Sequence, residues 1–231
     1  MSLEKRLPGY RFGAVLVLLL VTFVFLATAP SGDWVQPMTV LLEGATLLTA
    51  LFASRVRPVI IRIASAVVIL GLVGSLVTTG TGVDSVAAVA VLNALLVGAA
   101  PLAIGWSVYK RGVIDSHTVL GAICIYVLLG MLWAFLFTAI DETTSGPFFA
   151  QTSASSTADF LYFSYVTLTT VGYGDLTAAG GFGRAVAVLE ALLGQVYLVT
   201  VVALLVSNLG RGRSRSRPAD GPRPEAGQDH A

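Results

Sequence analysis

Apolar residues gather into long runs along this chain, and short polar segments separate the runs. An α-helix rises 1.5 Å per residue, so about 18 apolar residues cover most of the roughly 30 Å hydrocarbon core of a bilayer. The pattern therefore predicts an all-α membrane protein with six transmembrane helices. We expect these helices over residues Phe12–Ala29, Pro37–Phe52, Val59–Thr79, Ser85–Ile104, Thr118–Ile140 and Phe182–Leu209.

A seventh apolar run, Phe160–Leu168, is too short to cross a bilayer. Ser156 and Asp159 precede it with the spacing of a capping box, which defines a helix N-terminus. We therefore predict a short re-entrant pore helix over residues 160–169, between the fifth and sixth spans. The polar segment Asp141–Thr157 ahead of it is then an outer loop.

Two of the long runs allow a second interpretation. The fourth contains Pro101, which disfavours a helix interior, so that helix is expected to kink or to break there. The segment after the break would lie at the interface and carry Trp106, Tyr109, Lys110 and Arg111. The first run could be a cleaved signal peptide, since Ala27-Thr28-Ala29 has the small-x-small form. A retained span is preferred, because the run is long and Pro30 would follow the cut.

Composition excludes most other classes of protein. With 55% hydrophobic and 12% charged residues over 231 positions, and a mean hydropathy of +0.83, the chain is too apolar for a soluble domain. Its one cysteine, Cys124, cannot form an intrachain disulfide, and His117 and His230 lie far apart. No cofactor is therefore predicted. No nucleophile, base and orienting group converge, so an enzyme is not expected.

The formal net charge is only +1, but the basic residues are distributed unevenly between the two ends of the predicted spans. Of the 14 Lys and Arg residues, 13 flank the ends of the predicted spans that share one side, and only Arg184 falls on the other. By the positive-inside rule, both termini are then cytoplasmic in a multi-pass protein of the plasma membrane. The carboxyl groups expected outside are those of Asp33, Asp84, Asp141, Glu142 and Asp175.

The polar segment Thr169–Asp175 directly follows the short helix and contains two glycines. A dehydrated K⁺ needs rings of oxygen atoms in place of its water shell, and backbone carbonyls can supply them. Inward-pointing carbonyls require alternating right- and left-handed backbone, which glycine adopts without a Cβ penalty. The predicted K⁺-binding residues of this selectivity filter are Thr170, which adds a hydroxyl at the inner end, and Val171, Gly172, Tyr173 and Gly174, with Asp175 at the outer mouth.

Residues Thr170–Asp175 match the signature of the potassium channel family without interruption, so this part of the chain resembles that family. The resemblance covers residues 118–210 and implies a fourfold ring of such loops, hence a homotetramer around one pore. Gly194, 20 residues after Gly174, resembles the hinge glycine of the family's inner helix. Close helix packing is the alternative explanation of that glycine. The residues that would continue its face into the cavity or gate are Leu198, Val202 and Val206.

The chain departs from the family pattern at two places. Voltage-gated members carry Arg or Lys at every third position of the fourth helix, whereas residues 85–107 contain no ionisable side chain. We therefore expect a channel that is not steeply voltage-gated. Val166 occupies the position where some bacterial members carry a Glu that bonds the filter Asp, so that support is absent.

Two carboxyl groups fall inside predicted spans. We predict that Glu190, with Thr169, supports the filter, either by pairing with hydroxyls such as those of Thr167 or Tyr197 or in protonated form. A helix contact unrelated to the filter is the alternative. Glu43 has no basic partner in the fourth span and is expected to form hydrogen bonds within the helix bundle.

The predicted organisation has three parts: a four-helix scaffold over residues 1–112, a pore domain over residues 113–210 and a disordered basic tail over residues 211–231. The predicted function is passive, K⁺-selective conduction. A less selective cation channel and a non-conducting subunit of a K⁺ transporter are the alternatives. The expected partners are other copies of the chain and the bilayer, not nucleic acid. Anionic lipids are candidate partners of Arg211, Arg213, Arg215 and Arg217.

Overall fold

The computed structural model describes residues 10–29, 32, 34–54, 56–81, 86–111, 116–153 and 155–214. Its helices are α1 (Tyr10–Thr28), α2 (Val35–Ala53), α3 (Pro58–Thr81), α4 (Val86–Arg111), α5 (Ser116–Thr143), α6 (Thr157–Leu168) and α7 (Gly181–Ser214). Over these residues the structure forms no strand, only an isolated antiparallel bridge between Phe149 and Ala178. The all-α prediction is confirmed.

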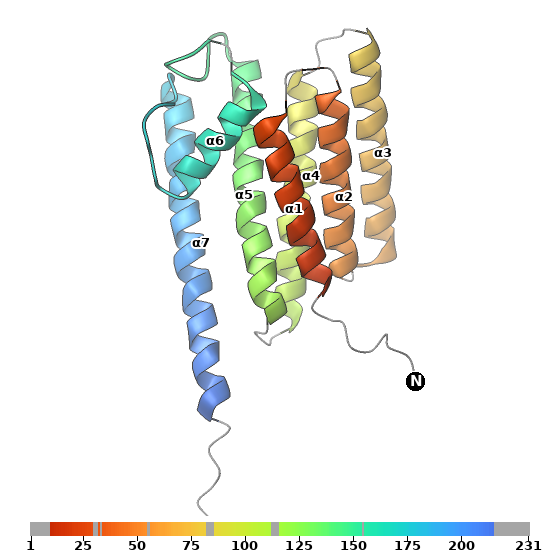
Figure 1. Cartoon of the computed structure of the whole chain (residues 1–231), viewed down its shortest axis with the longest axis vertical. Coiled ribbons are helices and arrows are strands. Elements are labelled where there is room, and N and C mark those ends of the chain that lie inside the picture. The colour runs from red at the N-terminus through yellow and green to blue at the C-terminus, as the bar shows by residue number, and fades with distance from the viewer. Residues whose placement is uncertain are drawn as a thin grey trace, which may run out of the picture.

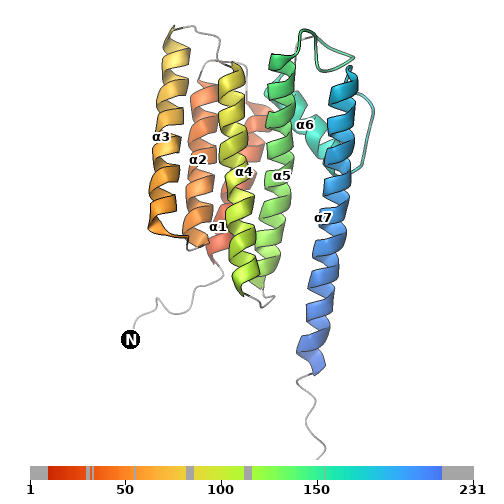
Figure 2. The same cartoon turned by 180° about the vertical axis from the view of Figure 1, so that it is seen from behind.

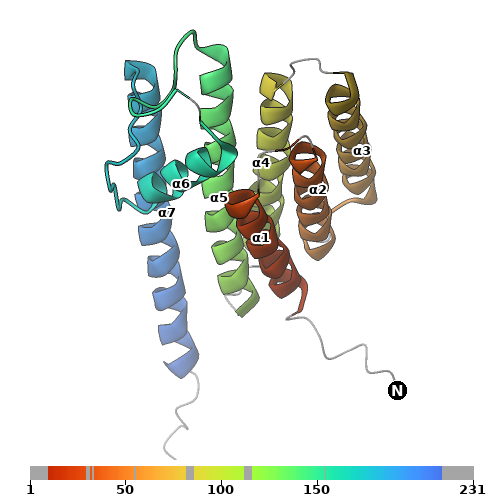
Figure 3. The same cartoon turned by 45° about the horizontal axis from the view of Figure 1, so that its top comes forward.

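Helices α1 to α5 pack into one bundle, and α7 stands beside α5 at one edge of it (Figure 1). Helix α3 lies at the opposite edge, as the view from behind also shows (Figure 2). Helix α6 is short and inclined, and it contacts α1, α5 and α7. With the top turned forward, the loops on either side of α6 lie at the same end of the molecule (Figure 3). In this arrangement, the segment after α6 lies beside α7.

Four helical segments are long and apolar enough to cross a bilayer: Val35–Ala53, Pro58–Val77, Val119–Thr143 and Gly181–Val201. Two shorter apolar segments, Phe12–Thr28 in α1 and Val91–Trp106 in α4, complete the set found in the described residues. Only 11% of the α7 segment is buried within the chain, against 44% of the α5 segment. An apolar helix exposed to this degree needs lipid or another chain to cover it.

Two predicted helix ends were wrong. Helix α4 continues through Pro101 to Arg111 instead of breaking, and Ala100 and Ile104 are buried on either side of the proline, where packing holds the helix together. Helix α7 continues to Ser214, four residues into the predicted disordered tail, since arginine is a good helix former. The rest of that tail, residues 215–231, lies outside the described residues.

A small cavity lies between α1, α2, α4 and α5, and the buried Glu43 of α2 lines it. Leucine, valine, alanine and methionine side chains of α1, α2, α4 and α5 form most of its wall, and Thr46 is the other polar residue there. Neither carboxyl oxygen of Glu43 has a hydrogen-bond partner among the described residues. The predicted hydrogen bonds within the bundle were therefore not found. A buried carboxyl group without partners lowers stability in either protonation state, and most strongly when it is ionised.

We expect that Glu43→Leu raises the thermal stability of the protein, because an apolar side chain of similar size removes the cost of burying unpartnered oxygens, about 1–3 kcal/mol. Glu43→Gln should give little gain, since its amide stays unpartnered. Melting temperature in detergent measures the effect. Glu142→Leu is the control and should be nearly neutral, because Glu142 is exposed. A Glu43→Leu protein that melts below the wild type would show that Glu43 has a stabilising partner.

Candidate functional site

The N-terminus of α6 is fixed by the predicted capping box. The hydroxyl of Ser156 accepts a hydrogen bond from the Asp159 backbone N–H (3.2 Å), and the Asp159 carboxylate accepts one from the Ser156 N–H (2.8 Å). Phe160 and Phe163 pack in a buried aromatic cluster against Phe148 of the loop between α5 and α6. Helix α6 is therefore anchored at the end farthest from the polar segment that follows it.

The segment after α6 has the left-handed backbone predicted for its glycines, with φ of 57° at Gly172 and 81° at Gly174. No heavy atom lies within 4 Å of a Cβ built on either residue. Glycine is therefore needed there for its backbone conformation and not for space. Thr170 is a third left-handed residue, with φ of 58°, which the sequence did not predict. A β-branched residue adopts this conformation only when its surroundings hold it there.

Hydrogen bonds from its N–H groups tie the start of this segment to α6. The Thr170 N–H donates to the Thr167 carbonyl (2.9 Å), and the N–H groups of Val171 and Gly172 donate to the Val166 carbonyl (2.9 and 3.3 Å). Within the described residues, no group donates to the carbonyl oxygens of residues 170–173. The lone pairs of these oxygens are therefore not used by hydrogen bonds within the described part of the chain. Among all the residues that the structure describes, no group of three or more His, Cys, Asp or Glu side chains could hold a metal ion.

Two tyrosine hydroxyls fix the C-terminal end of α6 to α5. The Tyr165 hydroxyl donates to the Val127 carbonyl (2.6 Å), and the Tyr126 hydroxyl donates to the Leu168 carbonyl (3.3 Å). The Tyr165 ring passes so close to Gly130 that a Cβ at that glycine would lie 2.6 Å from it. These residues were not predicted as part of the site. Tyrosine hydroxyls at membrane depth, which need a partner, were the signal available.

Helix α7 contacts the same end of α6 through Gly194. A Cβ at this position would lie 2.6 Å from the Leu168 carbonyl oxygen, which supports the close-packing explanation of this glycine. The helix runs without interruption through Gly194, and the hinge remains a prediction. Among the predicted cavity residues, Leu198 is half-buried, and the side chains of Val202 and Val206 lie outside the described residues.

Glu190 is buried between α7 and α6 and contacts Ser164, not Thr167 or Tyr197. The Ser164 hydroxyl lies 2.7 Å from the Gly130 carbonyl oxygen and 2.5 Å from Glu190 Oε1. A serine hydroxyl has a single hydrogen to donate, so both contacts are hydrogen bonds only when the Glu190 carboxyl carries a proton. The Tyr197 hydroxyl donates instead to the Ala122 carbonyl of α5 (2.6 Å).

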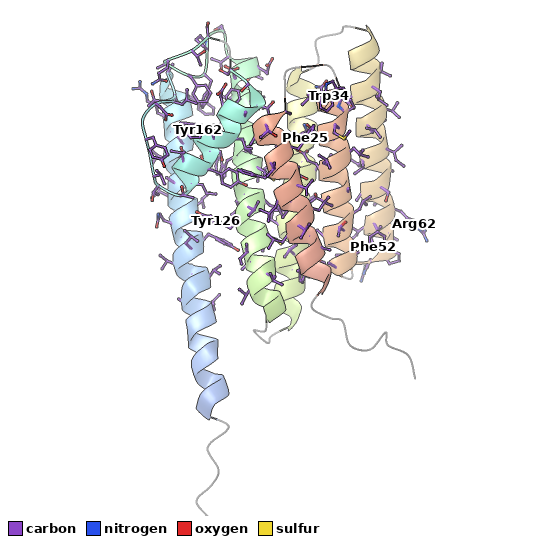
Figure 4. The ribbon with its side chains drawn as sticks, in the orientation of Figure 1. Phe25, Trp34, Phe52, Arg62, Tyr126 and Tyr162 are labelled. Carbon is purple, nitrogen blue, oxygen red and sulfur yellow. The ribbon has the colours of Figure 1, made fainter. Side chains whose placement is uncertain are left out.

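The Asp175 end of the segment is bonded to α6 through Tyr162, which lies in the upper part of the view in Figure 4. Its hydroxyl donates to Asp175 Oδ2 (2.7 Å), and its ring stacks on Tyr173 with centroids 6.4 Å apart. The hydrogen bond to Asp175 and the charge of that carboxylate raise the pKa of Tyr162 to about 12, so the phenol remains a donor at neutral pH. Tyr162 was not predicted as a site residue.

The loop between α5 and α6 is joined to the residues that follow Asp175. The Gln151 side chain accepts from the Thr177 N–H (2.9 Å) and donates to the Thr177 hydroxyl (2.8 Å). The Ala179 N–H donates to the Phe148 carbonyl (2.8 Å), beside the bridge between Phe149 and Ala178. The segment 169–175 is therefore held at both ends, by α6 at one and by this pairing at the other.

Comparison with known proteins gives a match for the same region. Residues 121–211 match the family model described as ion channel. Over 85 residues the chain is 36% identical to potassium voltage-gated channel subfamily A member 5 of Mustela putorius furo and 35% identical to member 10 of Homo sapiens. These alignments cover 35% of this chain but only 14% and 17% of those proteins. Protein LctB of Geobacillus stearothermophilus is 36% identical over 92 residues, which cover 40% of this chain and 64% of LctB.

Proposed function

Because the chain belongs to the potassium channel family, we propose that it forms a homotetrameric, K⁺-selective channel whose filter is the segment 170–174. One observation carries the proposal: the carbonyl oxygens of residues 170–173 receive no hydrogen bond from any described group, while the backbone at Gly172 and Gly174 is left-handed. Four such segments around an axis would offer stacked rings of oxygen atoms to a dehydrated K⁺.

Assembly into a tetramer is supported by the exposed face of α7. Its outward side chains are large and apolar, and they include Val188, Leu189, Leu192, Leu193, Val196 and Val199. Tyr173 and Val171 in the filter segment are exposed as well. Neighbouring copies that pack against α7 and the filter would cover both surfaces, and cyclic symmetry would close the ring.

In a bilayer we propose six spans, formed by α1 to α5 and α7, with α6 entering and leaving from the outer side. The N-terminal end of α1 and the C-terminal end of α7 lie at the same end of the molecule (Figure 1). Arg62, near the start of α3, also lies toward that end (Figure 4), and Arg57 directly precedes this helix. Basic residues gathered at one end support cytoplasmic termini in the plasma membrane. The arginines from Arg211 onward would then face anionic lipid.

We propose three regions: the scaffold over residues 1–112, the pore domain over residues 113–210 and the tail over residues 211–231. The scaffold packs directly on its own pore domain, since α4 and α1 both contact α5 and α1 reaches α6. Phe23 of α1 meets the Tyr165 ring edge-on at 5.0 Å. Through this contact with α6, the scaffold can stabilise the filter. Such a role needs no charged side chains in the scaffold.

We expect a gating charge far below that of channels with arginines in the fourth helix. Moving one charge through 100 mV is worth about 2.3 kcal/mol, and α4 offers no ionisable side chain before Lys110. Open probability recorded against voltage in planar bilayers measures this. A steep rise over a few tens of millivolts would contradict it and would point to Glu43 or to ion movement in the filter.

Flux into liposomes tests the proposal against its two alternatives. Purified protein is reconstituted with a K⁺ or a Na⁺ gradient, and uptake of each ion is followed. A K⁺-selective channel takes up K⁺ alone, a less selective cation channel takes up both ions, and a non-conducting subunit of a K⁺ transporter takes up neither. Protein without K⁺ uptake would contradict the proposed function.

A further inference from the structure

Helix α7 reaches the inner end of the filter segment through one side chain. The Gln195 amide donates a hydrogen bond from Nε2 to the hydroxyl oxygen of Thr170 (3.0 Å). Thr170 is the residue with left-handed backbone whose hydroxyl would be the innermost oxygen of the filter. The neighbouring hydroxyl of Thr169 donates to the Tyr165 carbonyl (2.6 Å), so it faces its own helix. Of these two hydroxyl groups, the one that α7 contacts is therefore that of Thr170.

A threonine hydroxyl rotates freely and can present either its hydrogen or its lone pairs to a neighbour. A cation attracts the lone pairs and is repelled by the hydrogen. The amide of Gln195 makes the Thr170 oxygen an acceptor on the side of α7, so the hydroxyl hydrogen cannot point there. The bond restricts the rotation and leaves a second lone pair free for a cation.

Contacts of the residues on either side of Gln195 fix the position of its backbone. Gly194 places α7 in direct contact with the Leu168 carbonyl, and Tyr197 is bonded to the Ala122 carbonyl of α5. The amide therefore reaches Thr170 from a backbone that is already fixed. In a tetramer, four such amides would surround the inner end of the filter.

We propose that Gln195 is a positioning residue that sets the affinity of the innermost cation site by orienting the hydroxyl of Thr170. This inference deepens the proposed function and rests on it. The site takes dehydrated cations of the size of K⁺. Ba²⁺ is the probe, because it is close to K⁺ in size, carries twice the charge and blocks conduction where it binds.

The experiment measures block of K⁺ current by cytoplasmic Ba²⁺ in the full-length tetramer. Gln195→Met keeps the length of the side chain and removes its donor, and the affinity for Ba²⁺ should fall about tenfold or more, as expected for the loss of one hydrogen bond in each of four chains. Val201→Met places the same side chain on another face of α7 and should leave block unchanged.

A double-mutant cycle separates positioning from a general effect on α7. Thr170→Ala removes the hydroxyl and should also weaken block, and adding Gln195→Met to it should then change block by less than twofold. Additive effects of the two substitutions, or block by Ba²⁺ unchanged in Gln195→Met, would overturn the inference. So would an assembled Gln195→Met tetramer that carries no K⁺ current. Gln195→Leu replaces Gln195→Met if that variant does not assemble. Wild-type protein without K⁺ current would instead contradict the proposed function itself.

Discussion

Gly172→Ala is expected to abolish K⁺-selective conduction while leaving membrane insertion and assembly intact. At φ of 57°, Gly172 has a left-handed backbone that costs an alanine roughly 1–2 kcal/mol, and a tetramer contains four copies. Apart from its chain neighbours, no atom lies within 4 Å of the added Cβ, so the substitution does not clash with the rest of its own chain. Its effect should act through the direction of the carbonyl groups, and hence on ion binding.

The permeability ratio of K⁺ to Na⁺, measured together with the amount of tetramer, tests this expectation. Gly146→Ala is the matched control, because Gly146 also has open space around it but no left-handed backbone. It should retain both selectivity and assembly. A wild-type permeability ratio in Gly172→Ala would show that the filter does not lie at residues 170–174.

Glu190→Val should destabilise the tetramer or shorten its openings, whereas Glu190→Gln should retain both properties. The carboxyl group contacts the buried hydroxyl of Ser164, which in turn contacts the Gly130 carbonyl. A glutamine amide can donate to the same hydroxyl in place of a protonated carboxyl. Valine removes the partner of a buried oxygen, at a cost of about 1–3 kcal/mol per chain.

Thermal stability of the tetramer and single-channel open times are the measurements for this pair. Glu142→Gln, at an exposed position, controls for the loss of a carboxylate. If Glu190 supports α6, both thermal stability and open times should be lower in the valine variant than in the glutamine variant. Should valine and glutamine both match the wild type, Glu190 is a peripheral contact, and Tyr126, Tyr162 and Tyr165 must hold α6 without it.

The parts of the site that could be predicted are those determined by residues close together along the sequence. The capping box at Ser156, the length of the short helix and the left-handed glycines follow from spacing and from the limits that sterics place on the backbone. The left-handed conformation of Thr170 could not be predicted, because threonine disfavours it and only contacts from α6 and α7 hold it there.

The features that could not be predicted depend on contacts between helices. Tyr162 reaches Asp175 only because the chain turns back along α6, and Glu190 meets Ser164 because Gly194 brings α7 close to the end of α6. Sequence spacing along one helix contains no information on which face of a second helix approaches it. Pro101 shows the same limit, since buried neighbours on both sides keep α4 continuous where the local preference favours a break.

Reversal potential under asymmetric ions tests the central claim most directly. Purified protein in a planar bilayer, with K⁺ on one side and Na⁺ on the other, is recorded at a series of voltages. A filter built from the carbonyl groups of residues 170–173 predicts a reversal potential far from zero, on the side set by the K⁺ gradient. Reversal near zero, with both ions carrying current, would contradict it.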